Sequence, residues 1–521
     1  MTSSQWASGL GPSGIVAAAI ALAACGTHGQ AAPIARDPAQ GAPTPSSATP
    51  SDPTAPITTS AETPAKAEPG AAKESPRAAF AAWLKARLPP GGELTGEGDA
   101  PPGVVHVAKK GDTWQSIAKA YLDLTTVYFD ADLAKEIVNA NLPDAKKGVL
   151  EGMRLTIPKL VAAPYKTGDA ERLGWPEDKQ VRGFYVRGDS AARAGFLSML
   201  GNMAKRGINA IVLDVKDYDG PLTYPSKVPL AIEAGATKNA PIASFSRTVR
   251  FAHQQGIRVI ARVSCFEDEL MAKAKPEISV RGKWGGPYGN GWLDPSNPGA
   301  QAYLIDLIKE AMDNGVDEIE LDYVRYPVLA IKNADFKLDP KNPLAKVEVI
   351  TGFVKKVHEL TKARSVPLSL DIFGVVAHGN HADIDMLGQD PMMLAPECEA
   401  LSPMVYPSHY NKGFYGFEEP GNHPEIVGIG TKGTLEQMAK RDAADKRPLA
   451  VVRPWLQAMY YKSSEYGPNY LAQEIKSAAD SGGVGWLMWN PQQDWSIAYQ
   501  AVPVKKLPPA PPTGAPQAGT Q

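Results

Sequence analysis

A strand–helix rhythm repeated eight times over residues 180–503 constrains the fold of this 521-residue chain more than any other feature. Each apolar run of strand length precedes an amphipathic helical segment, and Gly-Ile, Gly-Val or Gly-Gly-Val marks the turn into the next strand. Alternating units of this kind form parallel sheets covered by helices. The predicted strands are 181–186, 208–215, 257–263, 316–323, 366–373, 400–406, 449–456 and 484–489.

Eight units over residues 178–503 predict one (β/α)8 barrel of the TIM type, in the α/β class, with long loops after the strands. A doubly wound sheet is the alternative, but no Gly-x-Gly-x-x-Gly follows the first predicted strand. Barrels of this type carry their chemistry at the C-terminal ends of the strands. We therefore look for candidate functional side chains where the predicted strands end.

Two predicted strands end on an aspartate. Residues 318–327 read Glu-Ile-Glu-Leu-Asp-Tyr-Val-Arg-Tyr-Pro, so an alternating strand ends at Asp322, and the next strand ends in the same way at Asp371. Alternation turns both aspartates toward the barrel interior and makes Glu318 and Glu320 buried members of a network below them. Glycosidic cleavage needs such a pair, an acid at the leaving oxygen and an ionised carboxylate at the anomeric carbon.

Further polar and aromatic side chains are expected around this pair. Glu267, in the loop after the third strand, competes with Asp371 for the role of general acid. Aromatic rings suit the apolar faces of sugars, and nearby cations keep one carboxylate ionised. Alternatively, Asp322 is only a structural ion-pair partner of Arg325 or Lys216. The predicted substrate-binding residues are Asp214, Lys216, Arg262, Arg325, Tyr326, Tyr406, His409, Trp489 and Asn490.

Five motifs at the strand ends resemble the glycoside hydrolase-like barrel family of bacterial envelope proteins, which is distantly related to α-amylase-type barrels. They are Leu-Asp-Val-Lys-Asp (213–217), Leu-Asp-Tyr-Val-Arg-Tyr-Pro (321–327), Leu-Asp-Ile-Phe-Gly (370–374), Ser-Pro-Met-Val-Tyr-Pro-Ser-His-Tyr (402–410) and Trp-Leu-Met-Trp-Asn-Pro (486–491). The resemblance implies a TIM barrel that hydrolyses O-glycosyl bonds, with Asp322 as the nucleophile. Amylase-type barrels use a glutamate as the general acid on the fifth strand, where this chain has Asp371.

Residues 103–160 form a separate small module. A strand, a Gly-Asp-Thr turn that caps a helix, a later Ile-Val-Asn-Ala-Asn and a closing Gly-Met-Arg-Leu-Thr-Ile-Pro follow one another. This order resembles a LysM domain, a βααβ fold whose family binds N-acetylglucosamine chains such as peptidoglycan. Two features depart from that family: Trp114 replaces the usual leucine, and residues 122–134 are longer than the pattern.

The N-terminal region indicates export. Residues 14–24 are apolar but too short to span a bilayer, which suits a signal peptide over residues 1–25. They end in Leu-Ala-Ala-Cys-Gly, which resembles a bacterial lipobox and implies lipidation of Cys25, although no Lys or Arg precedes it. An ordinary cleaved signal peptide is the alternative. Gly26 in place of aspartate favours an outer-membrane lipoprotein facing the periplasm or the surface.

Two segments lack the residues to build a core. Residues 26–77 are rich in Ala, Pro, Ser and Thr and contain no aromatic residue, and residues 507–521 are Pro-rich. Such compositions do not bury enough apolar surface to offset ordering, so we expect a disordered tether and a disordered tail. Residues 78–90 are expected to add a short helix after the tether, since Phe80, Trp83, Leu84 and Leu88 recur at helical spacing. Cys265 and Cys398 are expected to be buried free thiols, with a disulfide between them as the alternative.

Charge and motif content narrow the function. A net charge of −2 gives no support for a nucleic-acid partner. No metal or cofactor is predicted, because His378, His381, Asp383 and Asp385 form the one suggestive cluster and read better as a surface loop. The sequence predicts an envelope glycoside hydrolase that acts on peptidoglycan or another polysaccharide and is targeted by the LysM-like module. The alternative is a non-catalytic scaffold that binds cell-wall glycan.

Overall fold

The computed structural model describes residues 75–96, 101–286, 288, 291–328, 333–336, 338–339 and 341–504. The expected signal peptide, lipidated Cys25, most of the expected tether and the expected tail lie outside these residues. Helix α1 (Pro76–Lys85) overlaps the short helix expected over residues 78–90, but it begins two residues earlier, inside segment 26–77, which corrects the expected end of the disordered tether. Phe80 and Leu84 of the helix are buried in the core of the N-terminal module.

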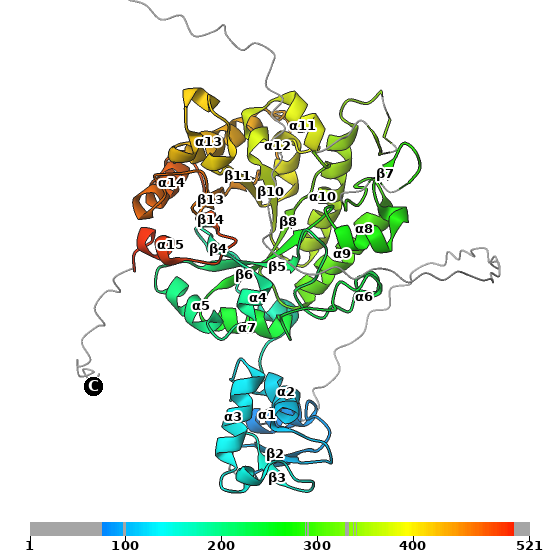
Figure 1. Ribbon diagram of the computed structural model, residues 1–521, viewed down its shortest axis with the longest axis vertical. Coiled ribbons are helices and arrows are strands. Elements are labelled where there is room, and N and C mark those ends of the chain that lie inside the picture. The colour runs from blue at the N-terminus through cyan, green and yellow to red at the C-terminus, as the bar shows by residue number, and fades with distance from the viewer. Residues whose placement is uncertain are drawn as a thin grey trace, which may run out of the picture. The chain divides into compact units, whose positions relative to one another are not determined.

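The N-terminal module is a small antiparallel sheet packed with helices α1, α2 and α3 (Figure 1). Its strands are paired in the order β1-β2-β3, and the expected strand, helix, helix, strand order follows from β2 onward, with β1 as an additional edge strand. Thr113 caps α2 through a capping box with Ser116, which fixes the Gly-Asp-Thr turn. The elements are β1 (Gly92–Thr95), β2 (Gly103–Val107), α2 (Trp114–Tyr121), α3 (Asp130–Ala140) and β3 (Arg154–Thr156).

Parallel strands close into a barrel over the predicted range. The order is β10-β8-β6-β5-β4-β14-β13-β11-β12, and an additional β10–β11 pairing closes the ring. This confirms the predicted (β/α)8 fold. The strands are β4 (Arg182–Val186), β5 (Ala210–Lys216), β6 (Arg258–Ser264), β8 (Glu318–Asp322), β10 (Leu368–Phe373), β11 (Ala400–Met404), β12 (Val451–Val452), β13 (Trp455–Gln457) and β14 (Trp486–Trp489).

One predicted strand is divided. The run predicted over 449–456 forms β12 and β13, which flank Arg453 and Pro454. Pro454 has no N–H to donate to a neighbouring strand, so the ladder is interrupted there. Both halves pair with β11, so the eight-unit barrel is preserved.

Helices surround the strands on the outside of the barrel (Figure 1). The longer ones are α5 (Phe196–Ala204), α7 (Phe245–Gln254), α9 (Pro298–Asp313), α10 (Ala345–Ala363), α13 (Ile426–Met438) and α14 (Pro468–Asp480). Shorter elements are α4 (Gly188–Ala191), α6 (Pro229–Glu233), α8 (Glu269–Ala274), α11 (His381–Leu387), α12 (Pro391–Leu394), α15 (Ser496–Ala501), β7 (Arg281–Gly282) and β9 (Ala334–Asp335).

The apolar core lies between the strands and these helices. Outward-facing residues such as Ile319 and Leu321 of β8 are completely buried there, so their neighbours in the strand face the interior. Cys265 and Cys398 are buried free thiols, as expected. Within the described part of the chain, no helix has the length and apolar character needed to cross a membrane.

Candidate active site

Arg262 of β6 lies among three carboxyl groups near the C-terminal ends of the strands. Its Nη1 donates to Asp214 Oδ1 at 2.5 Å, and its Nη2 and Nε donate to Asp322 Oδ2 at 2.6 and 3.0 Å. Asp371 Oδ2 lies 3.9 Å from the same Nε. The structure therefore brings Asp214, Arg262, Asp322 and Asp371, which the sequence places on four different strands, into one buried cluster.

Asp322 is held by hydrogen bonds on both oxygens. Besides Arg262, the backbone N–H of Tyr323 donates to Asp322 Oδ1 at 2.6 Å. These donors stabilise negative charge on the carboxylate and fix its orientation. Tyr323 has a φ of 48°, a left-handed conformation that is strained for an aromatic residue and is often found beside functional groups. The arrangement is suited to an ionised, oriented carboxylate.

Asp371 lies deeper and is almost completely buried. Its Oδ1 accepts a hydrogen bond from Trp455 Nε1 at 2.6 Å. Burial, together with the negative charges of Glu320 and Asp322, holds the pKa of Asp371 well above its usual range, against the opposing effect of Arg262. The protonated form of Asp371 is therefore favoured, but only 1% of its surface is exposed.

The barrel interior has more carboxyl groups than cations to pair with them. Two arginines contact this set, Arg262 near the top and Arg453 lower down. Carboxyls that outnumber their cations in a buried space do not all ionise. Burial raises the pKa of Asp214 to about 6 and that of Glu320 in the same direction. The five buried carboxyl groups are Asp214, Glu318, Glu320, Asp322 and Asp371.

Glu267 is the partly exposed carboxyl group of this region. Burial raises its pKa to about 7, with Arg325 opposing and Asp322 adding to the shift. The ammonium of Lys216 donates to the carbonyl oxygen of Glu267 at 3.0 Å and pairs with Asp268 Oδ2 at 3.2 Å, and both of these charged side chains are fully buried. The loop that carries Glu267 is thus fixed from below.

Two of the predicted substrate-binding residues, Lys216 and Arg325, are cations that contact other residues of the protein. Lys216 holds the Glu267 loop, whereas the Arg325 guanidinium lies 4.8, 5.2 and 4.5 Å from the ring centroids of Trp292, Tyr323 and Phe373. Arg325 remains 7% exposed beside Glu267, so it supplies positive charge to the upper end of the site.

Two of the predicted contacts are corrected. Tyr326 has no exposed surface, because its ring packs edge-on against Phe336 with Lys346 above it. The side-chain amide of Asn490 donates to the carbonyl oxygens of Ala458 and Asp494 at 2.7 and 2.6 Å, so it ties the last loop together. Neither side chain faces the mouth, because each is used in packing the loops.

Tyr406, His409 and Trp489 remain at the mouth. Trp489 stacks on Tyr185 with ring centroids 4.1 Å apart, and Arg262 lies over both rings. Tyr406 follows β11, and the charges of Asp371 and Asp322 add to the effect of burial in raising its pKa. His409 packs against Tyr406.

Sequence reasoning missed several residues of the cluster. Tyr185 donates to Asp214 Oδ2 at 2.5 Å, Trp455 donates to Asp371, and Arg453 forms two hydrogen bonds with Glu318. An arginine inside the apolar run 449–456 was the available signal for Arg453, because a cation in a barrel strand needs a buried anion. Tyr185 gave no comparable signal, since tyrosine is common in strands.

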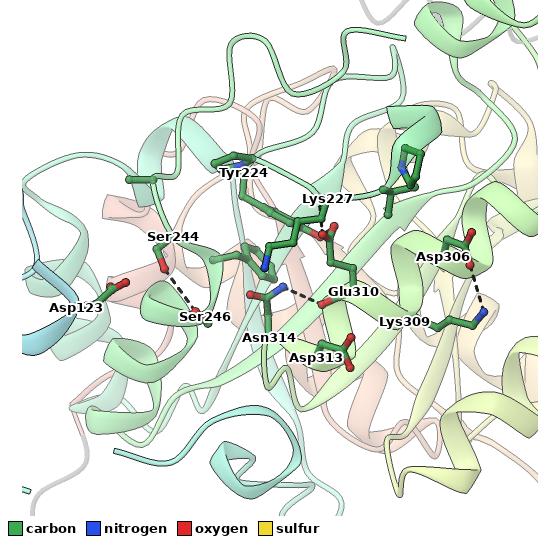
Figure 2. Close-up of a pocket in the computed structure, with 15 residues that line it drawn as sticks. Asp123, Tyr224, Lys227, Ser244, Ser246, Asp306, Lys309, Glu310, Asp313 and Asn314 are labelled. Atoms are coloured by element: carbon green, nitrogen blue, oxygen red, sulfur yellow. Dashed lines mark hydrogen bonds and ion pairs between the residues drawn. The ribbon is translucent and has the colours of Figure 1, made fainter. Parts of the chain in front are cut away.

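A pocket of ≈620 Å³ lies on the outer wall, where the segment before α6 and the start of α7 meet α9 (Figure 2). Glu310 projects into it but is already bound by Tyr224 Oη at 3.0 Å, Ser226 Oγ at 2.5 Å and the backbone N–H of Lys227 at 2.6 Å. This pocket does not include the clustered aspartates. Among the described residues, no group of three or more His, Cys, Asp and Glu side chains could hold a metal ion.

Comparison with known proteins gives one family match. Residues 183–495 match the family described as "Putative glycosyl hydrolase domain". No curated protein matches the chain. Similar solved structures include a hypothetical protein from Ruminiclostridium thermocellum ATCC 27405, which is 35% identical, with 36% of this chain and 96% of that chain covered and a TM-score of 0.33.

Two further similar structures are each 12% identical. The PgaB (BpsB) glycoside hydrolase domain from Bordetella bronchiseptica has a TM-score of 0.47 and covers 63% of this chain and 100% of its own. The spore cortex-lytic enzyme SleL from Bacillus cereus has a TM-score of 0.36 and covers 77% and 87%. The family match, which spans more than half of the chain, carries the assignment.

Proposed function

This chain belongs to the glycosyl hydrolase domain family whose match covers residues 183–495, and on that premise we propose that it hydrolyses glycosidic bonds in peptidoglycan or another polysaccharide of the bacterial cell envelope. The observation that carries the proposal is the contrast between two carboxyl groups at the barrel mouth. Asp322 is held by donors that favour negative charge, whereas burial raises the pKa of Glu267 to about 7. Two carboxyl groups in such different environments can serve as nucleophile and acid.

The proposed reaction follows from these two environments. Glu267, protonated near neutral pH, donates its proton to the leaving glycosidic oxygen while Asp322 attacks the anomeric carbon. A water molecule then hydrolyses the glycosyl ester on Asp322, and the Glu267 carboxylate accepts the proton from that water. Arg262 neutralises the charge that returns to Asp322 when the ester breaks.

Asp371 is the alternative proton donor. Its raised pKa suits an acid, but its near-complete burial and its hydrogen bond from Trp455 leave little room for a leaving group. Glu267 has a longer side chain and an exposed surface. In this mechanism Asp371 keeps the cluster electrically balanced, and Asp214 with Tyr185 holds Arg262 in place.

We also propose that the enzyme is held at the cell envelope, close to its substrate. The LysM-like module would bind the glycan and raise the concentration of substrate around the barrel. Lipidation of Cys25 would attach the protein to the outer membrane, facing the periplasm or the surface. Both expectations rest on the sequence motifs at 103–160 and 14–25.

A non-catalytic scaffold that binds cell-wall glycan is the second candidate. One observation favours it, because Asp322 is engaged by Arg262 through two N–H groups in the same way as a structural ion pair. The shared cation does not decide between the two functions, since an ionised nucleophile also needs a nearby positive charge.

Digestion of purified polysaccharides tests the proposal. The mature chain is incubated with peptidoglycan, polymers of N-acetylglucosamine, α-glucans and galactans, and released reducing ends are measured, with Asp322→Asn as the control. Wild type should release reducing ends from at least one polymer, and Asp322→Asn should not. Sedimentation of wild-type protein with cell walls without release from any polymer would contradict the enzymatic function and support the scaffold.

A further inference from the structure

A row of aromatic rings runs from the buried aspartates to the surface. Tyr406, at the end of β11, lies beside Asp371 and Asp322, whose charges raise its pKa together with burial. Its ring centroid is 5.2 Å from that of His409, which is 5.9 Å from that of Tyr461 in the loop after β13. Exposure increases along the row, from 8% at Tyr406 to 42% at Tyr461.

Rings also follow strands on the other side of β8, because β5 lies beyond β6 and β11 lies beyond β10 in the barrel order. Tyr323, the next residue in the chain, lies in a stacked arrangement with Tyr218 after β5, with ring centroids 6.1 Å apart. Both rings are partly exposed. We call Tyr406, His409, Tyr461, Tyr323 and Tyr218 the aromatic track, with Asp322 between its two arms.

Buried polar groups hold one arm of the aromatic track in place. Gln457, which has no exposed surface, donates to the carbonyl oxygen of Tyr461 at 2.9 Å and accepts from the backbone N–H of Ser408 at 3.2 Å. Ser408 Oγ in turn lies 3.2 Å from His409 Nδ1. One buried amide thus fixes two separate loops, so the rings they present are ordered before any ligand arrives.

The imidazole of this arm is uncharged, and Lys462 Nζ lies 5.2 Å from the Tyr461 ring centroid. Burial, together with the charge of Lys462, lowers the pKa of His409 to about 4, so the imidazole is neutral at physiological pH. Neutral rings present apolar faces with hydroxyl groups at their edges, which matches the apolar face and polar rim of a sugar. Exposed aromatic surface kept rigid in this way marks a binding surface.

From this geometry we propose that the aromatic track binds successive sugar rings of a polymeric glycan on both sides of the scissile bond, so that the barrel cleaves within chains. The inference rests on the proposed function and specifies its substrate class, a long polysaccharide. Tyr460, the residue before Tyr461, is 75% exposed.

The test compares Tyr461→Ala with Tyr415→Ala. Tyr415 is also an exposed tyrosine on a loop after a strand, but its ring contacts His378 and Phe414 and no member of the aromatic track. For the polymer cleaved in the digestion panel, Tyr461→Ala should lose about tenfold in kcat/KM, which corresponds to one aromatic contact, whereas Tyr415→Ala should match wild type. On an aryl glycoside that fills only the reacting position, the loss for Tyr461→Ala should be much smaller.

The size of the products and the affinity for glycan test the aromatic track independently of kcat/KM. Wild type should shorten the average chain before small products accumulate. The same two substitutions are also made in the Asp322→Asn variant, and affinity for soluble peptidoglycan strands and for the other soluble polymers is measured. Tyr461→Ala should weaken binding in this background, whereas Tyr415→Ala should not. Equal behaviour of Tyr461→Ala and Tyr415→Ala on every polymer, or release of only single terminal units, would overturn the inference. Absence of hydrolysis with a clear difference in binding would contradict the proposed function and leave the aromatic track supported.

Discussion

Strand β8 has buried carboxylates at both ends, and the two ends differ in what surrounds them. At its start, Glu318 is paired with Arg453 and accepts a hydrogen bond from Trp175 Nε1 at 2.6 Å. At its end, Asp322 shares Arg262 with Asp214 and with the nearby Asp371. Arg453 also lies 3.7 Å from Glu320 Oε1, so the lower group has one cation for two carboxyls, whereas the upper group has one cation among three.

This difference separates stability from chemistry along one strand. A carboxylate fully satisfied by an arginine and an indole has no capacity left for a ligand, and its removal is felt as lost stability. A cluster with excess carboxyls keeps some groups protonated and others ionised near neutral pH, which is the condition for acid–base and nucleophilic work. In TIM barrels, residues at the C-terminal ends of the strands carry the chemistry, whereas residues at the N-terminal ends contribute to stability.

The largest expected effect is at the upper end. Asp322→Asn should lower kcat by roughly 10⁴-fold, as loss of a nucleophile does in other enzymes, because the amide cannot attack the anomeric carbon. Release of reducing ends measures the loss, and thermal unfolding should show a folded protein. Activity within tenfold of wild type would place the nucleophile elsewhere.

At the lower end, Arg453→Met should act on stability. It leaves Glu318 buried without its cation, which costs about 3–5 kcal/mol of the free energy of unfolding. Denaturant unfolding measures the change, and activity per folded molecule should stay close to wild type. Adding Glu318→Gln should recover much of the loss, since the glutamine still accepts from Trp175. A double variant as unstable as Arg453→Met would show that the ion pair is not the cause.

Glu267→Gln should lower kcat by about 10²- to 10³-fold, the usual contribution of a general acid. Wild-type activity should fall as the pH rises through about 7, because the acid must be protonated and burial raises the pKa of Glu267 to about 7. A rate–pH profile of the variant should lack that alkaline limb. If Asp371→Asn removes the limb and Glu267→Gln keeps it, Asp371 is the acid.

The smallest expected effect concerns His253 at the lower end. Burial lowers its pKa, but hydrogen bonds and charges of Asp317 and Glu171 outweigh burial and raise it above 6.5. Its contribution to stability is therefore complete below pH 6.5 and is lost as the pH rises through the folded-state value. The difference in unfolding free energy between wild type and His253→Asn should shrink over that range. A difference that grows with pH would reverse the assignment.

Much of the fold could be predicted from the sequence because the strand–helix period is local. The ends of β8 and β10 and the inward direction of Asp322 and Asp371 follow from alternation alone. The division at Pro454 is also readable in the sequence, but the strong apolar run hid it. The short helix expected over 78–90 follows from the helical spacing of its apolar residues, but its start at Pro76 does not, because the residues before Phe80 carry no such pattern.

The sequence predicted many of the residues that form the site, but not which of their side chains pair with one another. Which carboxyl shares which arginine depends on how the strands close, so Arg262 was expected to bind substrate and instead bridges three aspartates. Lys216 and Asn490 are polar residues at strand ends. The sequence does not show that their side chains donate hydrogen bonds to backbone carbonyl oxygens of neighbouring loops. The side chains of Tyr326 and Arg453 are likewise placed by neighbours distant in sequence.

The central claim is that Asp322 attacks the sugar, and the anomeric configuration of the first product tests it most directly. Proton NMR during early hydrolysis of the polymer identified by digestion shows which anomer forms before mutarotation. Attack by Asp322 followed by attack of water requires two inversions, so the account predicts a product with the configuration of the substrate retained. An inverted first product would show that water attacks directly and would contradict Asp322 as the nucleophile.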